Sequence, residues 1–189
     1  DDEPDFASMI DTLGYGRDDR RLLDLAERSY DVMRCKVDPA AWMADCLHAY
    51  ALPEGIAAEQ TLWGAYYIKA RSDALASADA MLAQAEALCL REEALEKKCL
   101  PLLQKNRETV RTLMAETTWD GCVEAGLPSF GVMRMPKDAE NAEQIQTLRN
   151  EAKQMLKIVQ SYFYAPSEQV VEDLRKTVPA LRGLLTLLR

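Results

Sequence analysis

Helical periodicity is the feature that most constrains the fold of this chain. Apolar residues recur every three or four positions along most of its 189 residues, which is the spacing of one helix face. Runs that alternate apolar and polar residues are nearly absent, and no Asn-Gly or Asp-Gly hairpin joins two such runs. The sequence therefore predicts an all-α fold, an irregular multi-helix bundle with two long helices and one long loop.

Capping residues and helix breakers predict where these helices begin and end. Asp38 is a good N-cap and Pro39 suits a first helical position, so a helix is expected to start there. Ser72 predicts a bend inside the longest helical region, and Pro101 and Pro166 predict helix ends. The predicted helices cover residues 18–34, 39–50, 54–70, 73–98, 102–117, 136–165, 167–177 and 179–189.

The stretch WDGCVEAGLPSFGVMRMP, residues 119–136, interrupts the helical pattern. Its three glycines and two prolines predict a loop of unusual length for a helical bundle. The loop carries Trp119, Phe130 and Met133, and apolar side chains in a free loop are typical of a partner-binding surface.

Charge is unevenly distributed along the chain. The net charge is −8, and residues 1–19 alone hold seven acidic side chains and one basic one. We expect an acidic, partly flexible arm over residues 1–17, followed by a single helical domain over 18–189. The arm is either solvated or meets a protein partner with a basic surface. This balance predicts no nucleic-acid partner, and the absence of a long uncharged apolar run predicts no transmembrane segment.

Four of the five cysteines form two similarly spaced pairs, Cys35 with Cys46 and Cys89 with Cys99. On one continuous helix Cys89 and Cys99 lie roughly 15 Å apart, whereas a disulfide needs α-carbons within about 7 Å. Each is therefore expected to bond to another element. An antiparallel hairpin pairs Cys35 with Cys99 and Cys46 with Cys89, a parallel one exchanges the partners, and a local Cys35–Cys46 bridge is a third arrangement. Cys122 is the candidate free thiol.

Disulfides would place the protein in an oxidising compartment. The first residue is Asp rather than Met, which is what removal of a leader or trimming of the chain would leave. The sequence thus favours a periplasmic or secreted protein. A cytoplasmic protein with five reduced, buried thiols is the alternative.

Catalytic chemistry has little support in the sequence. His48 is the one histidine, so a di-iron bundle with a His from each of two helices is excluded by count. A Cys–His pair is conceivable with Cys35, Cys99 or Cys122. Gly14-Tyr15-Gly16 lacks the third glycine and the preceding strand of a nucleotide loop. We predict no catalytic residues, no cofactor and no metal ligands.

Two apolar surfaces are candidates for protein contacts. LWGAYY brings together Trp63, Tyr66 and Tyr67, residue types that either fill a core or dominate interfaces. The segment after Pro179 has a leucine stripe that predicts docking on the bundle or homo-oligomer formation.

These observations favour a non-enzymatic binding protein of the inhibitor or toxin-immunity type that occludes a protein partner. Two alternatives remain. One is a structural or scaffold subunit of a bacterial secretion or envelope assembly. The other is an enzyme with a Cys or carboxylate site near residues 119–136.

Overall fold

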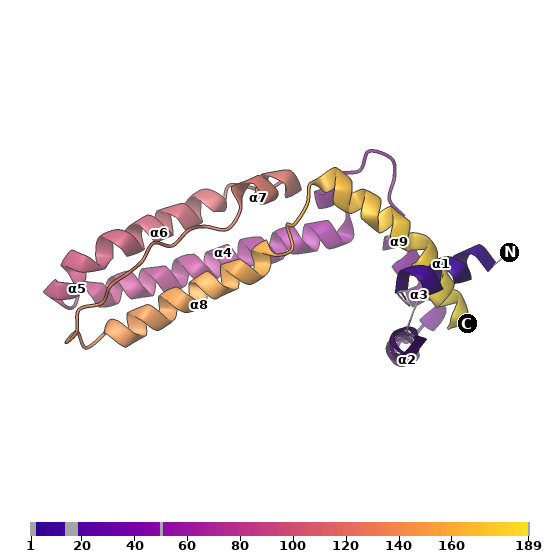
Figure 1. Ribbon diagram of the computed structural model, residues 1–189, viewed down its shortest axis with the longest axis horizontal. Helices are drawn as coiled ribbons and strands as arrows, with labels where there is room; N and C mark the ends of the chain where they lie inside the picture. Colours follow the sequence, from indigo (N-terminus) through magenta and orange to yellow (C-terminus); the bar gives the residue numbers. More distant parts are fainter. Residues whose placement is uncertain (1–2, 14–18, 50, 189) are drawn as a thin grey trace. The chain divides into compact units, whose positions relative to one another are not determined.

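The computed structural model describes residues 3–13, 19–49 and 51–188, and every regular element in them is a helix (Figure 1). The predicted all-α fold is therefore confirmed. The chain divides into two compact units, unit 1 with residues 1–61 and 168–189, and unit 2 with residues 62–167. The predicted arm over 1–17 lies partly outside the described residues, and the single domain over 18–189 stays a prediction. No helix in the described part is long and apolar enough to cross a bilayer.

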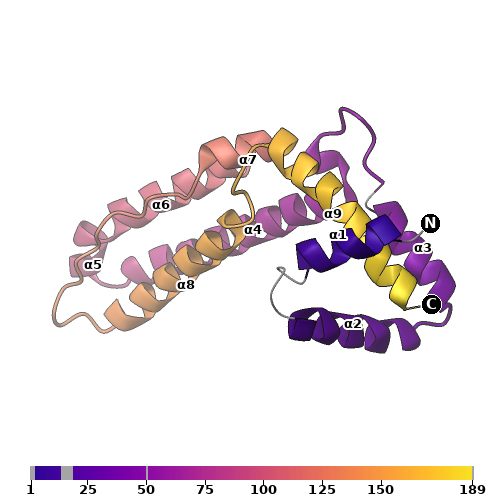
Figure 2. The same ribbon diagram turned by 45° about the vertical axis from the view of Figure 1, so that its right-hand side comes forward.

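Unit 1 is built from the two ends of the chain. It holds α1 (Glu3–Leu13), α2 (Asp19–Arg34), α3 (Pro39–Ala49), the 3-10 helix η1 (Ala58–Gln60) and all but the first residue of α9 (Ser167–Leu187). Figure 2 shows α1, α2 and α3 near the end of α9. Met9 of α1 packs against Ala180 and Leu184. Met33 and Met43 pack against Leu185, so α9 is the common support of the three N-terminal helices.

Two details of unit 1 test the capping arguments. Asp38 accepts a hydrogen bond from the amide of Ala41 at 2.9 Å and caps α3 as predicted. Pro179 was expected to open a new helix, but α9 runs through it. Burial of Ala180 and Leu184 on the same face as the residues before the proline favours a continuous helix, which offsets the one lost backbone bond.

Unit 2 is a helical bundle around one long helix. It contains α4 (Leu62–Cys89), α5 (Glu93–Lys98), α6 (Leu100–Leu113), α7 (Trp119–Ala125) and α8 (Ala142–Gln160). Its core stripe on α4 alternates large and small side chains, which lets α6 and α8 approach closely. The buried residues of this stripe are Leu75, Ala78, Leu82, Ala85, Leu88 and Cys89.

The direction of the helices explains the long loop. Arg71 near the start of α4 reaches Leu113 at the end of α6, so these two helices run antiparallel. Glu92, before α6, accepts a hydrogen bond from Asn141, before α8. Trp119, after α6, contacts Phe163, after α8, so α6 and α8 run parallel. Parallel neighbours require a connection that travels back along the bundle. The extended segment 126–141 does so, between α6 and α8 in Figure 1.

Segment 126–141 is long enough to run back along the bundle to the start of α8. Its sixteen residues can span about 50 Å, whereas the 19 residues of α8 measure about 28 Å. Phe130 is buried in the core, and Met133 and Met135 pack against it. The first part of the predicted loop is instead helical, because the hydroxyl of Thr118 accepts from the amide of Gly121 and caps α7.

Several predicted boundaries in unit 2 are wrong: α6 ends at Leu113 instead of 117, α8 covers Ala142–Gln160 instead of 136–165, and two further errors concern α4. Helix α4 has no break at Ser72, and it ends at Cys89 instead of continuing to Lys98. The carboxylate of Glu92 in the following turn accepts from the backbone and side-chain amides of Asn141, at 3.0 and 2.6 Å. These bonds lower the pKa of Glu92 and tie the turn to the beginning of α8. Glu92 and Asn141 are 49 residues apart in the sequence, so helical periodicity cannot predict their contact.

The predicted disulfides are absent, since all five cysteines are free thiols. Cys89, Cys99 and Cys122 are buried, and the first two belong to the main core of unit 2. Cys99 also contacts the sulfur of Met135 at 3.5 Å. Their thiols act as small apolar groups in the core, and the chain reverses between α4 and α6, so the assumption of one continuous helix was wrong.

Candidate functional site

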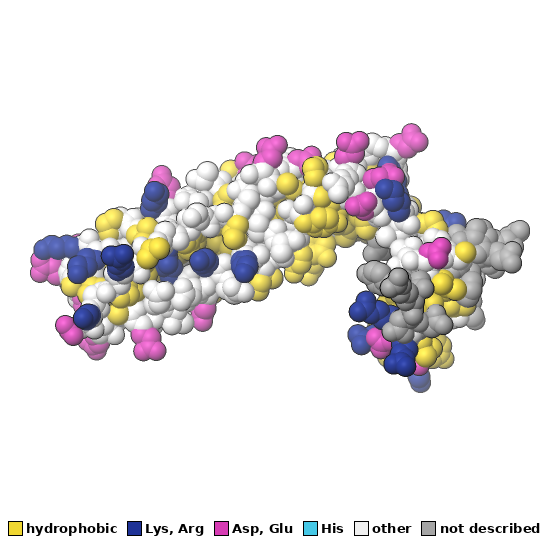
Figure 3. Space-filling view, viewed as in Figure 1, with side chains coloured by type: hydrophobic (Ala, Val, Ile, Leu, Met, Phe, Trp, Pro, Cys, Tyr) yellow, Lys and Arg dark blue, Asp and Glu magenta, His cyan; other side chains and the backbone are white. Residues whose placement is uncertain are grey.

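A row of basic side chains lies along unit 2 where α8 and segment 126–141 are neighbours. Lys153 and Lys157 follow Arg149 by four and eight residues, so the three share one flank of α8. Arg134 and Lys137 are exposed on the adjoining segment. We call Arg134, Lys137, Lys153 and Lys157 the basic strip. Figure 3 shows a row of Lys and Arg on this face of unit 2.

Few carboxylates lie beside the basic strip, and the nearest in sequence is the exposed Asp138, which directly follows Lys137. Residues 126–137 contain no acidic side chain. Glu151 on α8 points away from Lys153, because two residues along a helix turn through about 200°. No ion pair involves the basic strip in the part of the chain described here, whereas the exposed Lys69 and Lys97 are each paired four residues away along their helices. The strip therefore keeps its positive charge available.

Arg149 lies next to the strip and is 5% exposed. Its Nε donates to Oδ1 of Asn106 at 3.1 Å, and its Nη2 donates to the carbonyl of Gly131. The guanidinium also faces the ring of Phe130, 5.5 Å from the centroid. These partners are all uncharged, and burial lowers the pKa of Arg149. These hydrogen bonds use two of the three guanidinium nitrogens, and no carboxylate among the described residues pairs with the cation.

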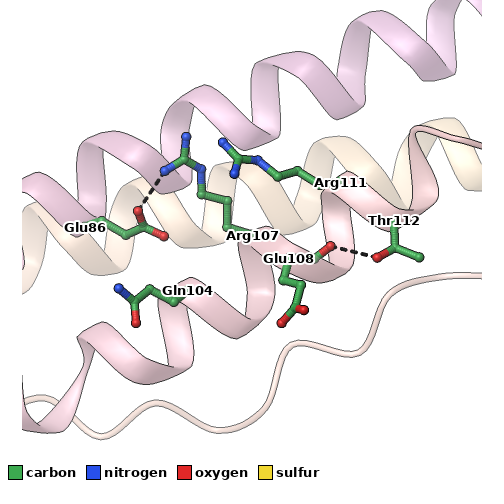
Figure 4. A pocket seen from close by; sticks show the side chains of 6 residues that line it. All are labelled: Glu86, Gln104, Arg107, Glu108, Arg111 and Thr112. Atoms are coloured by element: carbon green, nitrogen blue, oxygen red, sulfur yellow. Dashed lines mark hydrogen bonds and ion pairs between the residues drawn. The ribbon is translucent and has the colours of Figure 1, made fainter.

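A second charged site joins α4 to α6 (Figure 4). Arg107 donates to Asp79 at 2.8 Å and to Glu86 at 2.8 Å, and Arg111 donates to Asp79 at 2.9 Å. The bond from Arg107, and then that from Arg111, lowers the pKa of Asp79. The adjacent cavity has a volume of about 540 Å³, and the residues that line it are all of polar types: Glu86, Gln104, Arg107, Glu108, Arg111 and Thr112. Because the carboxylates neutralise the arginines, this site fastens two helices and attracts anions weakly.

Aromatic rings gather at the opposite end of unit 2 from α5. Trp63 and Trp119 pack edge to face at 5.4 Å, and Trp119 contacts Phe163 at 4.6 Å. Tyr67 of α4 contacts Tyr162 just after α8, also at 4.6 Å. We call these five residues the aromatic cluster.

The structure separates the six predicted partner-binding residues into two groups. Trp63, Tyr66, Tyr67 and Trp119 come together in or beside the aromatic cluster. Phe130 and Met133 belong to the main core instead. Trp119 is 1% exposed and donates from Nε1 to the carbonyl of Ala165 at 2.9 Å, whereas Tyr66 is 67% exposed. Their role as partner-binding residues stays a prediction.

Sequence reasoning missed the basic strip. The signal was present as Arg149, Lys153 and Lys157 at four-residue intervals, beside a stretch of twelve residues without an acid. Net charge concealed it, because most of the excess of acids lies in residues 1–19. No cluster of three or more His, Cys, Asp or Glu that could hold a metal occurs among the described residues.

No protein-family model matches the chain. It is similar to an ATP-dependent helicase/nuclease subunit of Acetivibrio thermocellus, with 24% identity over 98% of this chain and 16% of that protein. The protein of the same name from Desulforamulus reducens is 26% identical over 96% of this chain and 15% of its own length. That of Pelotomaculum thermopropionicum is 28% identical over 97% of this chain and 15% of its own length.

These similarities correct several predictions. The relatives are ATP-dependent helicase/nuclease subunits, which contradicts the predicted inhibitor or immunity function and the predicted periplasmic or secreted location. The argument for export depended on disulfides, and the cysteines are free thiols. The same relatives contradict the prediction of a non-enzyme, although this chain matches a small part of each relative. The prediction that the protein has no nucleic-acid partner is contradicted as well. The alternative prediction of an enzyme agrees better with these relatives than the predicted binding protein does.

This chain matches only a small part of each relative's length. The relatives align along nearly all of this chain, and the chain spans 14–16% of the length of five such proteins. The whole chain therefore resembles one section of a much longer ATP-dependent helicase/nuclease polypeptide.

Proposed function

We propose that this chain works as a helical section of an ATP-dependent helicase/nuclease and helps to hold the nucleic acid on which such an enzyme acts. One observation carries the proposal. Five relatives share that name, and each aligns with 95–98% of the chain, which includes both units.

The proposed contribution is binding. ATP hydrolysis by a P-loop enzyme uses a G-x-x-x-x-G-K-[ST] motif, which this sequence does not contain. We assign nucleotide hydrolysis and strand cleavage to other sections of such a protein. A rigid helical section that positions the substrate raises the rate of a reaction carried out elsewhere, because a strand held in place reaches the reacting groups more often.

The charge distribution of unit 2 supports this role. Unit 2 has thirteen basic and fourteen acidic side chains, so it is almost neutral although the whole chain carries −8. Several of its acids are engaged in ion pairs, among them Asp73, Asp79, Glu86 and Glu93. The basic strip has no such partners in the described residues. Phosphate groups are recognised by Lys and Arg whose charge is not already neutralised, and the basic strip presents four of these.

Direct binding tests the proposal. The purified full chain is titrated into fluorescently labelled single-stranded and duplex oligonucleotides at low ionic strength, and the anisotropy is followed. We expect saturable binding to at least one form, with an affinity that falls as salt rises, because phosphate contacts release counterions. Absence of binding to both forms at low salt would overturn the proposed function.

A further inference from the structure

We propose that the basic strip binds the sugar–phosphate backbone of a nucleic-acid strand. This inference rests on the proposed function and names the surface that performs it. Lys153 and Lys157 are one helical turn apart, about 6 Å along α8. Arg134 and Lys137 continue the positive surface along segment 126–141. A linear row of cations matches a linear row of phosphates better than it matches a single compact anion.

Arg149 strengthens the attraction of this surface. Its charge is buried, with uncharged hydrogen-bond partners. A buried charge acts over a longer range than an exposed one, because less water screens it. A phosphate on the flank of α8 would supply the negative charge that Arg149 lacks. The buried cation and the strip therefore favour the same ligand by two independent routes.

The strip is a better phosphate site than the cavity between α4 and α6. Arg107 of that cavity is already neutralised by Glu86 and by the neighbouring Asp79, so an entering phosphate would have to displace or approach carboxylates. Binding at the basic strip breaks no ion pair found in the described residues. It also requires little ordering of the backbone, since Lys153 and Lys157 are on a regular helix.

Charge complementarity and the relatives identify the occupant as nucleic acid. Relatives named helicase/nuclease act on a polymer that carries one negative charge per nucleotide. Asn150 and Gln154 are exposed beside the two lysines, together with the apolar Ile158, and amide side chains donate hydrogen bonds to phosphate and sugar oxygens. Contacts of this kind carry no sequence information, so binding is expected to be independent of base sequence.

A pair of matched double variants of the full chain tests the inference. Lys153→Gln with Lys157→Gln removes two charges from the strip. Lys69→Gln with Lys97→Gln removes two ion-paired lysines elsewhere in unit 2 and changes the net charge equally. Circular dichroism and thermal unfolding check that both variants fold as the parent does. Binding is measured with single-stranded DNA, duplex DNA and poly-glutamate at several salt concentrations.

We expect the strip variant to raise the Kd for nucleic acid roughly tenfold and to reduce the salt slope by about 2, one for each lost phosphate contact. The control variant is expected to stay within about twofold of the parent. If the two variants bind nucleic acid equally well, the basic strip is not the binding surface. The proposed function would still hold in that case, provided that the parent protein binds nucleic acid. If the parent protein does not bind nucleic acid at all, the proposed function is wrong. Binding of poly-glutamate as tight as that of DNA also overturns the assignment to a sugar–phosphate backbone.

Discussion

Two arginines are buried in unit 2 without a carboxylate partner, and each stabilises a different junction. Arg149 joins α8 to α6 and to segment 126–141. Arg71 donates to the carbonyls of Leu113 and Glu116, at 3.1 and 3.5 Å, where α6 ends. The last carbonyls of a helix lack internal partners and carry its negative partial charge, which suits a cation. Both arginines therefore act as fasteners of the backbone.

Replacing Arg71 measures the strength of one fastener. Arg71→Met keeps an apolar stem of similar length but removes the hydrogen bonds to the end of α6. We expect the free energy of unfolding in urea to fall by about 1–2 kcal/mol. Lys69→Met, at an exposed position on the same helix, is the control and is expected to change it by less than about 0.5 kcal/mol. Equal effects of the two substitutions would refute the role assigned to Arg71.

Thiol reactivity follows burial. Burial raises the pKa of Cys89 to about 11, with further contributions from Cys99 and nearby carboxylates, so about 0.1% is thiolate at pH 8. Cys35 is exposed. Native protein treated with iodoacetamide at pH 8 should be alkylated first at Cys35, whereas Cys89, Cys99 and Cys122 should react after unfolding in urea. Peptide mass mapping reads the order, and early alkylation of Cys89 would contradict the buried position of its thiol.

The ion pairs at Asp79 make stability depend on acidity. Arg107 and Arg111 lower the pKa of Asp79 in the folded protein, below the value of about 3.9 in an unfolded chain. The stabilisation is thus complete above pH 4 and is lost as the pH falls through the folded pKa. Asp79→Asn should cost about 1 kcal/mol at pH 6 and nearly nothing at pH 2. Unfolding in urea between pH 2 and pH 6 measures this difference in the free energy of unfolding, and Asp73→Asn is the exposed control. A difference between parent and Asp79→Asn that does not change with pH would contradict the ion-pair role.

At the scale of elements, the predictable features were those encoded locally. The Asp38 cap of α3 depends on residues within one turn, and it appears as expected. The end of α4 depends on Glu92 meeting Asn141, and the course of segment 126–141 depends on α6 and α8 being parallel. These are tertiary contacts, which a single sequence does not display. The basic strip was locally readable, but net charge concealed it.

Close packing of α4 against its neighbours can be tested by enlarging one alanine. Ala85 is fully buried in the core stripe, whereas Ala87, half a turn away, is exposed. Ala85→Leu forces extra methyl groups into a filled space and is expected to lower the free energy of unfolding by about 1–3 kcal/mol. Ala87→Leu adds the same atoms in solvent and should change it by less than about 0.5 kcal/mol. If Ala85→Leu stabilises the protein, α4 is not packed closely at this position.

For the whole molecule, the two units differ in how the chain builds them. Unit 2 is one continuous stretch with its own core, whereas unit 1 needs residues 168–189 to cover Met9, Met33 and Met43. We therefore expect the fragment 62–167 to be helical by circular dichroism and to unfold cooperatively in urea. The fragment 1–61, deprived of α9, should lack a cooperative transition. Cooperative folding of 1–61 alone would contradict the support assigned to α9.

The aromatic cluster has a mechanical consequence. Trp63 follows the first residue of unit 2 and Phe163 precedes its end by four residues, and the ring of Trp119 bridges them. Tension applied between the two ends of the unit would cross these three rings and bypass the long axes of α4, α6 and α8. While the rings hold, a load applied at this end of the unit does not stretch α8, the helix that carries Lys153 and Lys157.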